Sequence, residues 1–532
     1  MDGRRRVRLN YLAPVSTEAL PRRHAPRLGV RAAPLAAAAS LLALVGVSLF
    51  LRTRALDGPF WIDEGLTVGI ASFPLAEIPG VLRQDGSPPL YYLLLHVWMD
   101  AFGASEAATH ALSLVFALLA VPAALWAGWS LFGRRGGWIA AALAAVNPFL
   151  TIYAQETRMY SLVILLSIVA SAAFAHAFVF RRRGYVPLFV VALVVMLYTH
   201  NWALFFAAGV LAAIAVAARS SREPRAVVRD AALAFGAAAL AYAPWVPTLV
   251  YQTFHTGAPW SNPPSPLELG GGLVVVLAGE GAVVALLLAA GAGLSGLVRG
   301  PAKAARTAVL GIMALAGGTL LSAWIVSQAT PAWANRYLGV LMGPVFLVAA
   351  AGLPRAGRLG LVALALIIGF WATYTVGNSK SNVDILAARY ETAVRPGDVI
   401  VSTQPEQVPV LAYYFGHDKP YATPLGPVAE TRVMDWRDVL GKLEAARPET
   451  TLAPLLDALP RGGRVLLVRP LVRSEDAWSA PWTELVRRRS EEWAFVLAVD
   501  ERFIRTQEYV PPYTDRVQRA LVVELFEKTT SG

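Results

Sequence analysis

Long apolar stretches alternate with short polar connections over the first 376 residues of the chain. About eleven stretches run for roughly 16 to 27 residues each, close to the ~20 apolar residues that a helix needs to cross a bilayer. The pattern therefore predicts an α-helical polytopic membrane domain over residues 32–376. The stretches lie at about 32–51, 108–132, 136–152, 159–180, 185–200, 202–218, 228–250, 272–298, 305–328, 337–353 and 358–376.

The connections between these stretches differ in charge. Alternate connections, together with the N-terminal 31 residues, hold 22 of the 27 Lys and Arg residues that precede residue 377. Cytoplasmic loops collect Lys and Arg, so residues 1–31 are expected to form a basic cytoplasmic segment of a plasma-membrane protein. The remaining connections are expected outside. An odd number of spans also leaves residues 377–532 outside.

Two regions depart from the pattern of membrane spans. The first outer loop, residues 52–107, is long, and its segments 66–81 and 90–102 are typical of short helices lying along the interface on either side of a turn at 85–89. After residue 376, β-branched runs follow turn residues at 399–401 and 464–468, while 411–415 and 436–445 have helical character. Residues 377–532 are therefore expected to form an extracytoplasmic α/β domain.

Composition narrows the class further. The chain is 56% hydrophobic and 16% charged, with a mean hydropathy of +0.50, which is too apolar for a soluble protein of 532 residues. It has no cysteine, so disulfides and thiolate metal sites are excluded. The net charge of +11 arises in the membrane domain and follows its topology, so we do not interpret it as nucleic-acid binding.

Two adjacent carboxylates, Asp63 and Glu64, follow the first apolar stretch and are flanked by Phe60, Trp61 and Ile62. Apolar surroundings raise the pKa of a carboxylate and suit it to accept a proton from a hydroxyl group. Neighbouring helical residues point about 100° apart, so one base and one supporting group are expected. A helix N-terminus or a solvated turn is the alternative explanation.

Other outer-face polar residues lie at the ends of apolar stretches. Glu156, Arg158 and Tyr160 recur at spacings of two, which could form either a structural ion pair or a phosphate contact from Arg158 oriented by Glu156. Arg336 precedes Tyr337 at the start of the tenth stretch and could snorkel to headgroups. Cations are scarce on this face, however, which favours both arginines as partners of an anionic lipid. His200 is either structural or a supporting residue of the site.

The ordered set of motifs resembles the glycosyltransferases of the GT-C fold that use polyprenyl-phosphate sugars. It is most similar to glycosyltransferase family 39, which includes protein O-mannosyltransferases and bacterial aminoarabinose transferases. The order of the motifs and the side of the membrane on which they lie match over roughly residues 30–376. The chain departs from the aminoarabinose branch, which has a lysine before the position of Pro88, whereas this chain has none there. The motifs are Trp61-Ile62-Asp63-Glu64, Asp85-Gly86-Ser87-Pro88-Pro89-Leu90-Tyr91-Tyr92, Phe102-Gly103, Tyr153 to Tyr160, and Arg336-Tyr337-Leu338.

The resemblance implies roles for some of these residues. Asp63 would be the catalytic base with Glu64 beside it, Ser87 to Leu90 and Arg336 would approach the donor phosphate, and Glu156 would be the acid of the second outer loop. From their own positions on the outer face, Arg158 and Tyr337 are expected to join the phosphate site, and Asp85, Tyr160 and His200 to support it. A divalent cation, Mg²⁺ or Mn²⁺, could bind near Asp63 or Glu156, since oxygen ligands suit it, but no spacing demands one.

The expected reaction is an inverting transfer of mannose or a pentose from a polyprenyl monophosphate to a hydroxyl group. The acceptor would be an envelope polysaccharide, glycolipid or protein on the outer face. A lipid or solute transporter is one alternative, although internal repeats and midplane charges are not evident. A non-catalytic membrane scaffold that binds envelope components is another, but it leaves the ordered acids and arginines unexplained.

Overall fold

The computed structural model describes residues 32–373, 379–512 and 517–530 of the chain. The chain divides into two compact units, Met1–Ala43 and Leu44–Gly532. In the first unit the described residues are the start of helix α1 (Ala32–Arg52). The second unit contains all the other membrane helices together with the C-terminal α/β region. The predicted cytoplasmic segment 1–31 lies outside the described residues.

Eight helical segments among the described residues are long and apolar enough to cross a membrane, and one bent pair could add a ninth. Helices suit these apolar runs because every backbone polar group in lipid must be paired within the segment. The segments are α1, α5 (Glu106–Phe132), α8 with η1 (Tyr160–Phe174, Ala175–Val179), α10 (Ala203–Ser220), α11 with η3 and α12 (Pro224–Tyr242, Ala243–Trp245, Val246–His255), α14 (Glu280–Arg299), α15 (Lys303–Ala329), and η4 with α16 and η5 (Asn335–Leu341, Met342–Gly352, Leu353–Ala356).

The bent pair consists of α6 (Arg134–Val146) and α7 (Pro148–Ala154), which meet at 52°. Pro148 cannot donate a helical hydrogen bond and disfavours helical backbone at the residue before it. Asn147 accordingly adopts extended backbone, and its side chain caps α7 by accepting a hydrogen bond from the Leu150 amide at 2.9 Å. The sequence pattern predicted one stretch here without this bend.

Each of the eleven predicted stretches contains a helix, which confirms the α-helical polytopic class. Two of these helices are shorter than a typical span: α9 (Val186–Thr199) and α17 (Arg358–Ala372). A third stretch, 272–298, is wrong as a single span, because the structure forms α13 (Pro266–Val276) and α14 there. The break comes at Ala278 and Gly279, whose φ angles of 49° and 137° end a helix. Hydropathy alone does not register such a backbone reversal.

Small residues allow close helix packing. A Cβ added at Gly209 of α10 would lie 2.3 Å from the Leu315 carbonyl oxygen of α15, so a larger residue could not stand there. At the opposite end of the membrane helices from the cavity described below, Arg181 and Arg183 bind the Asp230 carboxylate at 2.9 and 3.0 Å. Two of the predicted cytoplasmic connections therefore meet at one end.

The loop after α1 forms three helices: α2 (Ile62–Ala71), α3 (Ile78–Asp85) and α4 (Leu90–Phe102). The predicted segment 66–81 is thus divided between α2 and α3. Pro74 lies in the break, where its missing N–H prevents a continuous helix. Gly86 follows α3 with φ of 102°, a conformation that favours glycine. This turn directs residues 85–89 toward the start of α2.

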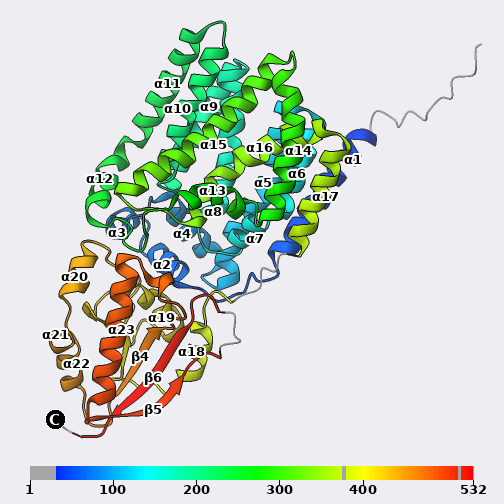
Figure 1. Ribbon diagram of the computed structural model, residues 1–532. Coiled ribbons are helices and arrows are strands. Elements are labelled where there is room, and N and C mark those ends of the chain that lie inside the picture. Colours follow the sequence, from blue (N-terminus) through cyan, green and yellow to red (C-terminus); the bar gives the residue numbers. More distant parts are fainter. Residues whose placement is uncertain (1–31, 374–378, 513–516, 531–532) are drawn as a thin grey trace, which may run out of the picture. The chain divides into compact units, whose positions relative to one another are not determined.

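The C-terminal region is the predicted α/β domain, and its described residues form one six-stranded sheet in the order β3-β2-β1-β4-β6-β5. Figure 1 shows β6 between β4 and β5 in this sheet. The central strands β1 and β4 are parallel to each other, and β1 is also parallel to β2. The predicted runs at 399–401 and 464–468 fall within β1 and β4. The strands are β1 (Val399–Ser402), β2 (Tyr421–Thr423), β3 (Gly426–Val428), β4 (Arg464–Pro470), β5 (Phe503–Tyr509) and β6 (Leu521–Lys528).

Helices cover both faces of this sheet. α18 (Val383–Tyr390) and α19 (Val408–Phe415) pack on the face that carries Ile400 and Leu466. α22 (Ala453–Ala458) and α23 (Pro481–Val499) pack on the face that carries Val401 and Leu467. Successive apolar side chains of β1 and β4 point to opposite faces of the sheet, so each face contributes to a hydrophobic core beneath its helices. The short helices α20 (Val439–Ala445) and α21 (Pro448–Thr451) complete the connection from β3 to β4.

Candidate active site

Asp63 and Glu64 both lie in the first turn of α2, and their side chains point in different directions. Trp61 precedes the helix, and its amide donates to Glu64 Oε2 at 3.3 Å, which fixes the start of α2. Acidic side chains in a first turn are also stabilised by the helix dipole. Asp63 lines a cavity of about 650 Å³. Glu64, one residue later on the helix, has no exposed surface.

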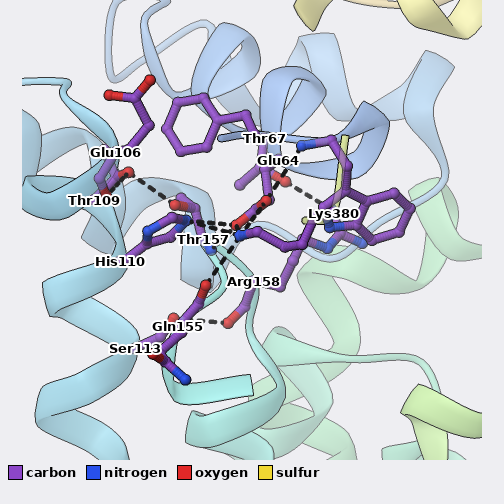
Figure 2. A network of polar contacts seen from close by, with 12 residues as sticks. Glu64, Thr67, Glu106, Thr109, His110, Ser113, Gln155, Thr157, Arg158 and Lys380 are labelled. Carbon is purple, nitrogen blue, oxygen red and sulfur yellow. Dashed lines mark hydrogen bonds and ion pairs between the residues drawn. The ribbon is translucent and has the colours of Figure 1, made fainter. Parts of the chain in front are cut away.

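Glu64 is enclosed by hydrogen-bond donors from three distant segments (Figure 2). Lys380 Nζ lies 2.7 Å from Oε2, His110 Nε2 lies 2.7 Å from Oε1, and the Thr157 amide donates to Oε1 at 2.8 Å. Burial would raise the pKa of Glu64, but the charge of Lys380 and the contact with His110 lower it to about 2. Glu64 therefore remains an anion that joins these segments, and it does not line the cavity.

Lys380 comes from the C-terminal region and reaches into the membrane domain. Its Nζ also donates to the Gln155 carbonyl oxygen at 3.0 Å (Figure 2). His110, on α5, bonds to the Leu56 carbonyl oxygen through Nδ1 at 2.6 Å. Together these contacts fix α2, α5 and the 155–158 segment against the beginning of the C-terminal region.

Asp63 faces arginines from two other segments. Its Oδ2 lies 3.4 Å from Arg336 Nη2 and 3.9 Å from Arg158 Nη2. Arg158 is fixed in turn, because its Nη1 donates to Thr67 Oγ1 at 2.6 Å and to the Asp63 carbonyl oxygen at 3.3 Å. The Asp63 side chain is 20% exposed, so the cluster is open to the cavity.

A third arginine comes from the C-terminal domain. The Arg519 guanidinium lies 3.6 Å from the centre of the Trp61 ring, and Arg336 lies 5.7 Å from the same ring. The Arg519 amide donates to the Lys380 carbonyl oxygen at 3.3 Å, so the two cations stand on neighbouring segments. Arg519 also lines the cavity. Two guanidinium groups therefore contact the Asp63 carboxylate, and a third lies over the neighbouring Trp61 ring. This gathering of positive charge favours an anionic ligand.

The other predicted site residues divide between the cavity wall and its support. Asp85, Ser87, His200 and Tyr337 line the cavity with Arg158 and Arg336. Burial raises the pKa of Asp85 even though Ser87 bonds to it. Burial and the nearby charges of Arg158 and Arg336 lower the pKa of His200 to about 3, so this imidazole is neutral at pH 7.

Glu156 and Tyr160 lie behind the wall. Burial and the charge of Glu64 raise the pKa of Glu156 to about 7, and its Oε2 has no hydrogen-bond partner among the described residues. The Tyr160 ring packs 5.8 Å from His200 and 6.2 Å from Tyr337. The predicted orientation of Arg158 by Glu156 is replaced by the contact of Arg158 with Thr67.

A divalent cation near Asp63 or Glu156 stays a prediction. Across the described ranges, no group of three or more His, Asp or Glu side chains lies close enough to hold a metal ion. Arginines stand beside Asp63, and their charge opposes a bound cation.

The sequence did not point to His110, Lys380 or Arg519. Lys380 and Arg519 are more than 300 and 450 residues from the carboxylates in the chain, and neither belongs to a motif. A local signal existed only for His110, a polar residue at the start of the apolar stretch 108–132. The C-terminal cations could be found only from the fold.

The protein has the fold of known GT-C glycosyltransferases. It is similar to ArnT from Cupriavidus metallidurans in the apo state, with 14% identity, 92% of this chain and 98% of that chain covered, and a TM-score of 0.58. ArnT bound to undecaprenyl phosphate gives 14% identity, coverage of 93% and 98%, and a TM-score of 0.57. The arabinofuranosyltransferase AftD from Mycobacteria gives 16% identity, coverage of 92% and 42%, and a TM-score of 0.51. No protein-family model and no curated protein matches the sequence.

These similarities confirm the expected GT-C fold. The match with ArnT covers 92% of this chain, so the similarity of fold includes most of the C-terminal region. At 14–16% identity they establish the fold alone. The chemistry has to be argued from the residues around Asp63.

Proposed function

We propose that this protein is a membrane glycosyltransferase that transfers a sugar from a polyprenyl monophosphate to a hydroxyl group of an envelope acceptor. The observation that carries the proposal is the cluster of Asp63 with Arg158, Arg336 and Arg519 on one cavity wall. It offers a proton acceptor and an anion site in direct contact. The fold shared with ArnT, which binds undecaprenyl phosphate, supports a lipid-linked donor.

The arginines would hold the donor phosphate. Guanidinium groups bind phosphate oxygens through paired hydrogen bonds, and they keep their charge in partly buried sites. Arg336 Nη2 is 3.4 Å from the Asp63 carboxylate, so a phosphate bound there would lie next to the base. Ser87 and Tyr337 line the same cavity and can add neutral hydrogen bonds.

The reaction follows from this placement. Asp63 accepts the proton of the acceptor hydroxyl as its oxygen forms a bond to the anomeric carbon. The bond from that carbon to the phosphate oxygen breaks on the opposite side, and its electron pair remains on the phosphate. The configuration at the anomeric carbon inverts. The arginines meet the charge that develops on the leaving phosphate, and so stabilise the transition state without protonating it.

The sugar would be mannose or a pentose. The basic connections support a cytoplasmic position for residues 1–31 and a cavity on the outer face of the plasma membrane. The acceptor would therefore be an envelope polysaccharide, glycolipid or protein.

The test is donor consumption by the purified protein in lipid nanodiscs. Polyprenyl-phosphate mannose and polyprenyl-phosphate arabinose are supplied separately with a crude envelope fraction. The wild type is expected to consume one donor, and Asp63→Asn to consume it about 10²- to 10⁴-fold more slowly, since one base contributes that much. Asp57→Asn is the matched control, because Asp57 is exposed on the same loop and does not line the cavity.

Equal rates in the wild type and Asp63→Asn would remove Asp63 from the mechanism. Failure of every lipid-linked donor in a wider panel, with the protein folded, would contradict the proposed function.

A further inference from the structure

Part of the wall of the cavity that holds Asp63 is formed by the C-terminal domain. In α/β sheets, ligands bind at the carboxyl ends of parallel strands where the chain switches direction. Here β1 and β4 are adjacent and parallel. The connection from β1 to β2 runs through α19 on one face, whereas the connection from β3 to β4 runs through α22 on the other. The switch point therefore lies between β1 and β4.

The segments that follow these two strands line the cavity. After β1 come Gln404, Glu406 and Gln407, and after β4 come Leu471 and Ser474. The carboxyl ends of the strands thus face the same space as Asp63 and its arginines. This topological placement is independent of the cation cluster.

The wall formed by the segment after β1 is buried and polar. Gln404, Glu406 and Gln407 are 8%, 5% and 1% exposed. Glu406 Oε1 accepts hydrogen bonds from Gln404 Nε2 and from Trp482 Nε1, each at 2.8 Å. Glu406 Oε2 and Gln407 Oε1 have no partner in the part of the chain that the structure describes. Buried acceptors without donors are costly, so a ligand rich in hydroxyl groups would complete this wall.

Tryptophans stand beside these oxygens. Trp260 and Trp478 line the cavity and are partly exposed. The Trp260 ring packs 4.8 Å from Trp436, which packs 5.3 Å from Trp482, the donor to Glu406. A large flat ring with one polar atom suits the C–H face of a sugar ring, whose hydroxyls then reach neighbouring acceptors.

We infer that this part of the cavity is an acceptor subsite for a neutral saccharide, with Glu406 and Gln407 accepting hydrogen bonds from its hydroxyls and Trp260 and Trp478 contacting its ring faces. The inference rests on the proposed function, because it assigns the acceptor of that reaction to carbohydrate. A peptide acceptor fits less well. Extended peptides add to sheet edges, whereas β1 and β4 are central strands and the edges are β3 and β5. Beside Glu406 and Gln407 a hydroxyl group fits better than an anionic group, because the unpartnered oxygens there are acceptors.

The experiment measures binding without any donor, so that it does not depend on catalysis. Full-length protein in nanodiscs is titrated with linear mannotetraose, with linear arabinotetraose and with a Ser/Thr-rich peptide, followed by saturation-transfer NMR and calorimetry. At least one saccharide is expected to bind the wild type. Glu406→Gln keeps an oxygen that can accept the hydrogen bond from Trp482 and replaces Oε2 by an amide NH₂ group, which is a donor. Saccharide binding should therefore weaken about tenfold or more. Trp478→Leu, a change at a partly exposed position, should weaken binding several-fold.

The matched control is Glu449→Gln, since Glu449 is exposed on α21 and does not line the cavity; it should bind like the wild type. Saccharide binding that is equal in Glu406→Gln, Trp478→Leu and wild type overturns the inference, as does binding of the peptide alone or of no probe. If saccharide binding depends on Glu406 while no lipid-linked donor is consumed, the subsite stands and the proposed transferase fails. If donor is consumed while both variants bind saccharide like the wild type, the transferase stands and the subsite fails.

Discussion

Asp63 and Glu64 are consecutive residues of α2, yet one lines the cavity and the other has no exposed surface. Asp63 meets arginines at 3.4 and 3.9 Å, whereas Glu64 receives donors at 2.7 to 2.8 Å from α5, the 157 backbone and the C-terminal region. The rotation of about 100° per helical residue produces this division. Glu64 fixes the first turn of α2, and this turn holds the Asp63 carboxylate open to a substrate in the cavity.

The largest stability effect is expected at Glu64. Glu64→Gln removes the anion that Lys380 and His110 face, and breaking a buried ion pair costs about 3–5 kcal/mol. The midpoint of unfolding should fall markedly in nanodiscs or detergent, measured by thermal and denaturant scans. Asp57→Asn is the control and should unfold like the wild type. An unchanged midpoint for Glu64→Gln would show that the buried network does not hold the site.

Arg336→Gln should act on the donor and leave stability nearly intact. A hydrogen bond to a charged group contributes about 1.5–3 kcal/mol, so donor affinity should fall about 10- to 100-fold in a direct binding measurement. Arg54→Gln, a change to an exposed cation just after α1, is the control. Donor affinity equal to wild type would remove Arg336 from the phosphate site.

Arg519→Gln tests whether the C-terminal domain takes part in donor binding. Arg519 is partly buried and contacts Trp61 only through the ring face, so a smaller loss of donor affinity, about tenfold, is expected. Arg461→Gln is the control, because Arg461 is exposed on the same domain away from the cavity. If both variants bind donor equally, the domain supplies no phosphate contact.

The smallest effect is a pH dependence at Glu156. Its folded pKa of about 7 is above the ordinary value of 4.5, because burial and the Glu64 charge disfavour ionisation. The folded state therefore binds the proton more tightly, and the contribution of Glu156 to stability is lost as the pH rises from about 4.5 through 7. Glu156→Gln should raise the unfolding midpoint at pH 8 and change it less at pH 5. A larger gain at pH 5 would contradict this assignment.

Much of the fold was accessible from the sequence because apolar run length and loop charge are local properties. The α-helical membrane domain and the C-terminal α/β domain were both predicted, and Asp63, Arg158 and Arg336 do converge on one cavity wall. The scarcity of outer-face cations singled out those arginines, and their role as phosphate partners stays a prediction. Helix breaks were missed, as at Gly279, because a backbone reversal leaves the hydropathy of a stretch unchanged.

The contribution of the C-terminal domain could not be predicted. Lys380, Arg519 and Glu406 belong to no motif, and each reaches the site through tertiary packing across hundreds of residues. Helix geometry predicted one base and one supporting group, and the family resemblance pointed to Asp63 as the base. The burial of Glu64 could not be predicted, because it depends on where α2 begins. Long-range contacts of this kind are set by the docking of the two regions.

The most direct test of the account is a single-turnover measurement on Asp63→Asn with the lipid-linked donor already bound. Donor affinity is measured in the same preparation, so that binding and chemistry are separated. The account predicts affinity close to wild type and a first turnover slowed by about 10²-fold or more. A first turnover as fast as that of the wild type would contradict the assignment of Asp63 as the base.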